Sequence, residues 1–241
     1  MISCLMPTFN RYPQRAQLVE EAVESFLRQI VVPPHDTELL ICNDTPGQTL
    51  AFDHPRVRVL NVPQRFPTLA KKLRWLIDQA SGDLLCRWDD DDISLPWRLH
   101  LSVDQLGDRL EWHPSNYWYC PPGKVHHDAG HGNDHIQAIF RRELLDRIGG
   151  YPDGTWSGHE DADFTDALKR AGLWERGPEL PPEQIFYLYR WGISQHLSGR
   201  GGGATMQETY ERLGANPIAA ETFTIVPQWR QDYVSLVRPR A

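Results

Sequence analysis

The sequence predicts an α/β protein with a mostly parallel sheet flanked by helices. Two observations predict it: short apolar runs typical of buried strands alternate with amphipathic helical segments, and this strand–helix–strand order occurs twice. The strand-like runs are Ile2–Met6, Glu38–Cys42, Val57–Leu60 and Leu84–Trp88. We expect the third run to lie near an edge of the sheet, and Pro7 to end the first.

Each helix predicted between these strands has one broad apolar stripe. The first helix has Pro13 in its first turn and ends before Pro33 and Pro34. Its apolar residues are Leu18, Val19, Ala22, Val23, Phe26, Leu27 and Ile30. The second helix ends at Gly82, and its apolar residues are Leu69, Leu73, Leu76, Ile77 and Ala80. A third begins at Pro96 and turns Leu99, Val103 and Leu106 inward.

The second half of the chain is less regular. Residues 111–135 are rich in aromatic residues, Pro, Gly and His, and we expect irregular structure there. The elements predicted after it are a strand at Ile136–Phe140, helices at Arg142–Ile148 and Asp161–Ala171, a strand at Gln184–Trp191, and one helix beyond Thr205. Because no repeat or linker divides the chain, residues 1–241 form one predicted domain with halves at about 1–110 and 111–200 and a tail at about 201–241.

Composition narrows the class of protein. The chain has 241 residues, 40% of them hydrophobic, and a net charge of −7 that argues against general affinity for nucleic acid or acidic membranes. Its four cysteines lie far apart without a CxxC pair, which favours buried free thiols and a reducing compartment. No basic leader or apolar run of about 20 residues is present. These features predict a soluble cytoplasmic protein.

Four consecutive aspartates, Asp89 to Asp92, directly follow the strand Leu84–Trp88. Adjacent negative charges repel one another, and a hard divalent cation such as Mg²⁺ or Mn²⁺ relieves that repulsion through oxygen ligands. Open α/β sheets bind their ligands at the carboxyl ends of the strands, where these acids are expected. The alternative is a solvated acidic turn or a helix N-terminus.

Polar residues also follow the first two strands. They are Thr8, Asn10, Arg11, Asn43 and Asp44. In a parallel sheet these loops meet the aspartates at one edge, and an acid-rich edge with an arginine suits a nucleotide bound with a metal ion. Lys71, Lys72 and Arg74 could reach a diphosphate from the second helix, although a solvated helix face is the simpler interpretation.

Five segments in order resemble the family 2 glycosyltransferases of the GT-A fold. They are residues 3–11 with Pro7-Thr8-Phe9-Asn10-Arg11, residues 39–44, residues 82–99 with the aspartates as a DXD motif, residues 140–151, and residues 158–164 with Glu160-Asp161. Each motif alone is weak, but five in order are a strong signal over roughly residues 1–172. One departure is Asn43-Asp44-Thr45-Pro46, where the family usually has Asp-Asp-Gly-Ser.

The resemblance implies transfer of a sugar from a nucleotide-diphosphate sugar to an acceptor hydroxyl, with Mn²⁺ or Mg²⁺ and with inversion. The first half would bind the nucleotide sugar and the second half the acceptor. The donor contacts it implies are Pro7, Thr8, Asn10, Arg11, Asp44, Asp89 and Asp90. The metal ligands it implies are Asp91, Asp89 and, from a late histidine, His196, whose alternative role is at the surface or in structural hydrogen bonds.

The resemblance also supplies a general base. Asp161 matches the catalytic acid of the Glu-Asp motif, with Glu160 and Asp163 as competitors. Its alternative role is to stabilise the start of a helix electrostatically.

Two other functions stay open. A nucleotidyltransferase that makes nucleotide sugars would usually carry a Gly-rich phosphate loop after its first strand, and Met6-Pro7-Thr8-Phe9-Asn10 is not one. A non-catalytic, glycosyltransferase-like binding module is the second. The acceptor could be a glycan, a protein or another hydroxyl compound; the acidic charge argues against nucleic acid without excluding it. The histidines between 126 and 135 fit no zinc template, and an acceptor-side loop is the simpler interpretation.

Overall fold

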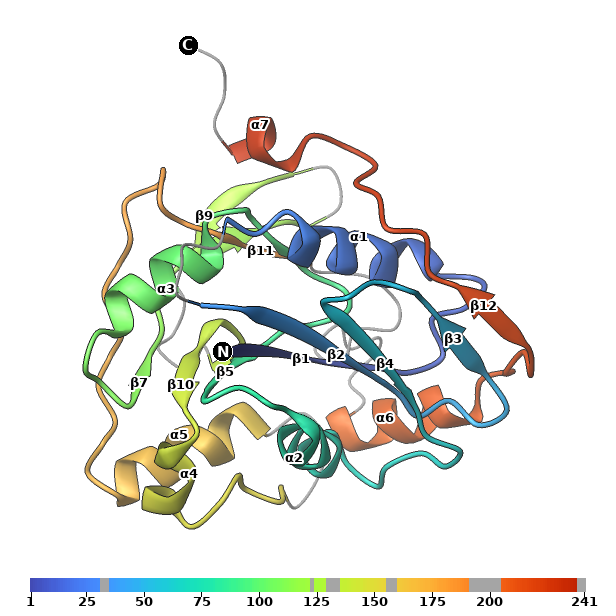
Figure 1. The fold of residues 1–241 in the computed structure, drawn as a ribbon, viewed down its shortest axis with the longest axis horizontal. Helices are drawn as coiled ribbons and strands as arrows, with labels where there is room; N and C mark the ends of the chain where they lie inside the picture. Colours follow the sequence, from blue (N-terminus) through green and yellow to red (C-terminus); the bar gives the residue numbers. More distant parts are fainter. Residues whose placement is uncertain (31–34, 122–123, 129–134, 155–159, 191–204, 238–241) are drawn as a thin grey trace.

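The computed structural model describes residues 1–30, 35–121, 124–128, 135–154, 160–190 and 205–237. A six-stranded sheet in the order β4-β2-β1-β5-β10-β7 forms its centre (Figure 1). The strands are β1 (Ile2–Thr8), β2 (Thr37–Asn43), β4 (Val57–Asn61), β5 (Leu84–Arg87), β7 (Glu111–Trp112) and β10 (Ile139–Arg141). Strands β1, β2, β4 and β5 are mutually parallel, which confirms the predicted sheet. Beyond β5, β10 pairs antiparallel with β5, and β7 pairs antiparallel with β10 at the edge. One prediction was wrong, since β1 continues through Pro7 to Thr8.

Helices cover both faces of this sheet (Figure 1). They are α1 (Ala16–Leu27), α2 (Leu69–Gln79), α3 (Arg98–Leu106), α4 (Glu143–Ile148), α5 (Glu160–Arg170), α6 (Met206–Ala215) and α7 (Tyr233–Val237). The sequence predicted one helix in the tail, whereas the tail contains α6 and α7. Local chemistry defines some of these ends: the Thr68 side chain accepts from the Lys71 N–H at the start of α2, and Thr205 and Glu208 form a capping box on α6.

Two apolar cores lie on opposite faces of the sheet. Alternate residues of β1 point to opposite sides, so Met6 packs with α1 and α3, whereas Leu5 packs with α2 and α5. Both faces are buried, as expected for parallel strands that are apolar along their length. The four cysteines are free; Cys4, Cys42 and Cys86 are buried, as predicted, and Cys120 is partly exposed.

Two smaller sheets were not predicted. One has the order β6-β11-β8-β9, and its strands are β6 (Ile93–Ser94), β11 (Tyr187–Tyr189), β8 (Tyr117–Tyr119) and β9 (His126–Asp128). The other pairs β3 (Thr49–Ala51) with β12 (Thr222–Thr224) in the tail. Strands of two or three residues are too short to leave a periodic pattern, which explains why residues 111–135 suggested irregular structure alone. Among the described residues, no helix is both long and apolar enough to cross a membrane.

Candidate active site

The aspartates after β5 lie in the interior of the protein. The side chains of Asp90, Asp91 and Asp92 are each less than a tenth exposed, and Arg11 from the loop after β1 is buried beside them. The alternative of a solvated acidic turn is therefore wrong. Buried carboxylates are costly unless they are paired, so the partners of these acids define the site.

Arg11 pairs with two of the aspartates. Its Nε and Nη2 donate to the two carboxylate oxygens of Asp90 at 2.8 and 2.7 Å, and Nη2 also donates to Asp91 Oδ2 at 2.8 Å. Burial by itself would lower the pKa of Arg11, but the charges of Asp90 and Asp91 raise it above its usual value. Burial likewise opposes ionisation of Asp90, and the charge of Arg11 outweighs it and lowers the pKa of Asp90. The predicted nucleotide-site residue Arg11 thus holds the predicted metal ligand Asp91.

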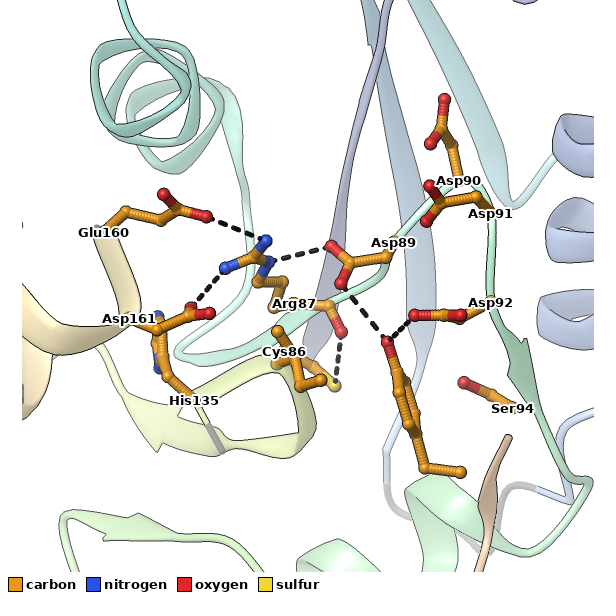
Figure 2. Close-up of polar contacts among 12 residues, drawn as sticks. Cys86, Arg87, Asp89, Asp90, Asp91, Asp92, Ser94, His135, Glu160 and Asp161 are labelled. Atoms are coloured by element: carbon orange, nitrogen blue, oxygen red, sulfur yellow. Dashed lines mark hydrogen bonds and ion pairs between the residues drawn. The ribbon is translucent and has the colours of Figure 1, made fainter. Parts of the chain in front are cut away.

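A second arginine, Arg87, joins the aspartates to the Glu-Asp motif (Figure 2). It is the last residue of β5. Its Nε lies 2.8 Å from Asp89 Oδ1, its Nη2 lies 3.1 Å from Glu160 Oε1, and its Nη1 pairs with Asp161 Oδ1 at 2.5 Å. Burial opposes the charge of Arg87, but Asp161, Asp89 and Glu160 raise its pKa well above the usual value. Sequence reasoning missed Arg87, although a charged residue that ends an apolar strand was a visible signal.

The two acids of the Glu-Asp motif differ in exposure. Both lie in the first turn of α5, where a negative charge is favoured by the helix dipole. The Glu160 side chain is 4% exposed, whereas that of Asp161 is 34% exposed. Only Asp161 of this pair is therefore open to a substrate, while both are held by the same guanidinium.

The fourth aspartate is fixed by β11. The Tyr187 hydroxyl donates to Asp92 Oδ2 at 2.7 Å and to Asp89 Oδ2 at 3.2 Å, and the Arg190 backbone N–H donates to Asp92 Oδ1 at 2.6 Å. Burial and the charges of Asp92 and Asp89 raise the pKa of Tyr187 well above its usual value, so its phenol remains a proton donor. The small sheet thus positions the end of the acidic run.

Asp44, predicted to contact the base or ribose, is 1% exposed. Lys72 Nζ donates to its Oδ1 at 2.6 Å and to the Thr8 carbonyl at 2.6 Å, and the Phe66 N–H donates to its Oδ2 at 2.8 Å. The interpretation of Lys72 as part of a solvated helix face is wrong, because this side chain is buried and links the ends of β1 and β2. In this arrangement Asp44 braces the edge of the sheet.

The loop after β1 is shaped by Asn10. This residue has a φ of 49°, in the left-handed region where asparagine is among the better tolerated side chains. Its N–H donates to Thr45 Oγ1 at 2.7 Å, and its Nδ2 donates to the Pro217 carbonyl at 3.3 Å. Pro7 and Thr8, the other predicted contacts of this loop, are the buried last residues of β1. The C-terminal tail therefore lies against the predicted nucleotide loop.

The predicted metal ligands have suitable chemistry but no ready cluster. Carboxylate oxygens suit Mg²⁺ or Mn²⁺, yet Asp91 is paired with Arg11 and Asp89 with Arg87. Within the part of the chain that the structure describes, no group of three His, Cys, Asp or Glu side chains could hold a metal ion. His196 lies outside the described residues. His135 is buried, lies 3.0 Å from the Tyr151 hydroxyl and stacks on Phe164, so it belongs to the core.

Comparison with known proteins supports the predicted resemblance. Residues 3–111 match the family model described as Glycosyl transferase family 2. No curated protein sequence matches the chain. Similar solved structures include S. aureus TarS 1–349 in complex with UDP, with a TM-score of 0.54 and 14% identity over 78% of this chain and 60% of that one. TarS 1–349 in complex with UDP-GlcNAc is similar with a TM-score of 0.53 and 15% identity, over 89% of this chain and 65% of that one.

A third similar structure is the mannosyltransferase PcManGT from Pyrobaculum calidifontis in complex with GDP-Man and Mn²⁺. Its TM-score is 0.55 and its identity 17%, over 89% of this chain and 68% of that one. At these identities the likeness shows the fold, which is that of the GT-A glycosyltransferases, as predicted. The chain covers less than two thirds of the length of TarS 1–349.

Proposed function

We propose that this chain, whose residues 3–111 match the glycosyl transferase family 2 model, transfers a sugar from a nucleotide-diphosphate sugar to an acceptor hydroxyl. One observation carries the proposal: Arg87 brings the acidic run after β5 and the Glu-Asp motif at the start of α5 into one ion-pair cluster. A donor bound at the acidic run and an acceptor bound near α5 would then meet at their reacting atoms.

Asp161 is the general base in this proposal. Its partly exposed carboxylate takes the proton of the acceptor hydroxyl as the acceptor oxygen attacks the anomeric carbon. The bond from that carbon to the diphosphate breaks, and the nucleoside diphosphate leaves with the bonding electrons. A single displacement of this kind inverts the anomeric carbon. Glu160 is too buried to receive the acceptor proton and instead anchors Arg87.

The donor lies at the carboxyl ends of β1, β2 and β5. In the proposal Arg11, Asn10 and the end of β1 face the nucleotide, and Asp90 and Asp44 hold the loops in place. Asp89 contacts either the ribose or the metal ion. Binding of UDP, UDP-GlcNAc and GDP-Man by the similar structures supports a nucleotide donor of this class. The acceptor is a glycan, a protein or another hydroxyl compound.

A divalent cation, Mn²⁺ or Mg²⁺, is part of the proposal, with Asp89 and Asp91 as its protein ligands. Bound there, it would stabilise the negative charge that develops on the departing diphosphate. The Mn²⁺ in the GDP-Man complex of the mannosyltransferase supports this choice. Four free thiols support a reducing compartment such as the cytoplasm.

The first test is a thermal-shift panel of UDP, GDP, CDP, ADP and dTDP, each with and without Mn²⁺. A nucleotide at about 100 times its dissociation constant adds about 2.7 kcal/mol to the free energy of unfolding. We expect one nucleotide to give a shift that requires Mn²⁺ and is lost in Asp91→Ala. No shift with any nucleotide would contradict the donor site.

Product analysis then separates the alternatives. With the matching nucleotide sugar, release of the nucleoside diphosphate and a glycosylated acceptor supports the transferase. Release of pyrophosphate from a nucleoside triphosphate and a sugar phosphate would support a nucleotidyltransferase. Nucleotide binding without turnover, unchanged by Asp161→Ala, would support a binding module.

A further inference from the structure

We propose that Arg87 is a positioning residue that holds the carboxylate of Asp161 in place for catalysis and ties it to Asp89 on the donor side. This inference rests on the proposed glycosyl transfer. Arg87 lies in the motif segment 82–99, but the resemblance assigned it no role. Arg87 orients the carboxylate of Asp161 and does not itself exchange a proton.

The Arg87 backbone is held from two sides. Arg87 is the last residue of β5 and pairs with Leu5 of β1 in the middle of the sheet. The buried side chain of Arg98 donates from Nη2 to the Arg87 carbonyl at 2.7 Å and from Nη1 to Ser94 Oγ at 2.7 Å. The base of the side chain is therefore fixed by a second, fully buried arginine, which suits a residue that must define another residue's position.

The guanidinium of Arg87 uses all three of its nitrogens. Nε contacts Asp89, Nη2 contacts Glu160 and Nη1 contacts Asp161 (Figure 2). A planar fork with three fixed donor directions sets the three carboxylates relative to one another, which a lysine ammonium cannot do. Because Glu160 is almost fully buried, it anchors one arm of the fork, and the other arm fixes the partly exposed Asp161.

The charges around Arg87 also support its role in positioning Asp161. One positive charge lies among three carboxylates from the loop after β5 and from α5. Among the described residues, the phenol of Tyr151 and the imidazole of His135 also lie close enough to feel this charge. Burial and the nearby charge of Arg87 lower the pKa of His135 well below its usual value, so this ring is neutral and adds no second cation. Without Arg87 the carboxylates would repel one another, and Asp161 would turn toward solvent.

The test compares Arg87→Lys and Arg87→Ala with Arg142→Lys. Arg142 is a matched control because its partly buried guanidinium bonds backbone carbonyls of Ile77, Ala80 and Gly82. A displacement of about 1 Å can cost roughly 100-fold in rate. We expect both Arg87 variants to lose roughly that factor in kcat. Their affinity for nucleoside diphosphate should fall much less, since Asp89 keeps its hydrogen bond from Tyr187, and Arg142→Lys should be unchanged in kcat.

Two further measurements separate positioning from a structural role. Added guanidinium ion at low millimolar concentration should restore part of kcat in Arg87→Ala, but none in Arg87→Ala combined with Asp161→Asn. If Arg87→Ala fails to fold, Glu160→Gln provides the second variant: it loosens the anchor of the fork and should lower kcat while nucleotide affinity is kept.

The outcomes are distinguishable. Equal kcat in the wild type and Arg87→Lys, or Arg87 and Asp161 effects that simply multiply in the double variant, would overturn the positioning role while leaving the transferase intact. A wild type that binds nucleotide yet forms no product with any donor and acceptor would overturn the proposed function, and the positioning role with it.

Discussion

Two arginine–carboxylate clusters lie side by side at the carboxyl edge of the sheet, and they differ in what they join. Arg11 pairs with Asp90 and Asp91, all from the first half of the chain, and every member of this cluster is less than a tenth exposed. Arg87 connects Asp89 in the first half with Glu160 and Asp161 in the second, and Asp161 is 34% exposed. We call the cluster around Arg11 the closed cluster and the cluster around Arg87 the open cluster. The closed cluster is suited to hold the donor loops in place, and the open cluster to contact an acceptor.

The largest expected effect is a loss of kcat without a loss of nucleotide affinity in Asp161→Asn. General base catalysis contributes 10² to 10⁴ in rate, so we expect kcat to fall by about 10³. Nucleotide affinity should be retained, because the closed cluster is untouched. Steady-state kinetics and a thermal-shift titration measure the two effects.

Asp166→Asn is the matched control, since Asp166 lies on the same helix with an exposed side chain 3.7 Å from Lys169. It should leave kcat unchanged. An Asp161→Asn enzyme that keeps its full rate would remove the distinction between the two clusters and point to Asp163 or another base.

Arg11→Ala should mainly lower the free energy of unfolding. It leaves Asp90 and Asp91 buried without their cation, and breaking a buried pair in this way costs about 3–5 kcal/mol. Urea denaturation followed by fluorescence measures the free energy of unfolding. Arg74→Ala, which breaks the exposed pair with Asp153, should cost less than about 1 kcal/mol. If Arg11→Ala and Arg74→Ala lost the same free energy of unfolding, burial would not distinguish the buried ion pair from the exposed one.

Tyr187→Phe should have an intermediate effect. It removes the hydroxyl that donates to Asp92 and Asp89, and hydrogen bonds to charged groups contribute about 1.5–3 kcal/mol. Because Asp89 also belongs to the open cluster, kcat should fall modestly as well. A loss of stability with unchanged kcat would limit the role of the Tyr187 hydroxyl to holding Asp92.

The smallest expected effect is in the acid dependence of stability. The pKa of Asp90 is lower in the folded state than its ordinary value, so the folded state binds fewer protons there than the unfolded state. The ionised Asp90 therefore adds to the free energy of unfolding above the ordinary aspartate pKa of about 3.9. This stabilisation is lost as the pH falls through the pKa of Asp90 in the folded state. Denaturation curves between neutral and acid pH should show a shallower loss in Asp90→Asn than in the wild type; a parallel loss would contradict the pairing.

Much of the site could be predicted from the sequence because its acids follow strands. Alternating apolar runs predicted the parallel sheet, and the positions of Arg11, Asp44 and Asp89 after strands predicted that their loops would share an edge. Resemblance to a family added Asp161, which no local pattern distinguishes from an acid at a helix start. Residues 3–111, which match the family model, carry most of these signals.

The sequence by itself determined the four parallel strands of the central sheet and the acids at their carboxyl ends, because hydrophobic periodicity is a local property. Only the tertiary structure decided which cation meets which acid. Arg87 lies 73 residues from Glu160, and Tyr187 lies 95 residues from Asp92. Such partners are chosen by the packing of α5 and β11 against the sheet, and the cost of burying each charge alone makes those pairings specific.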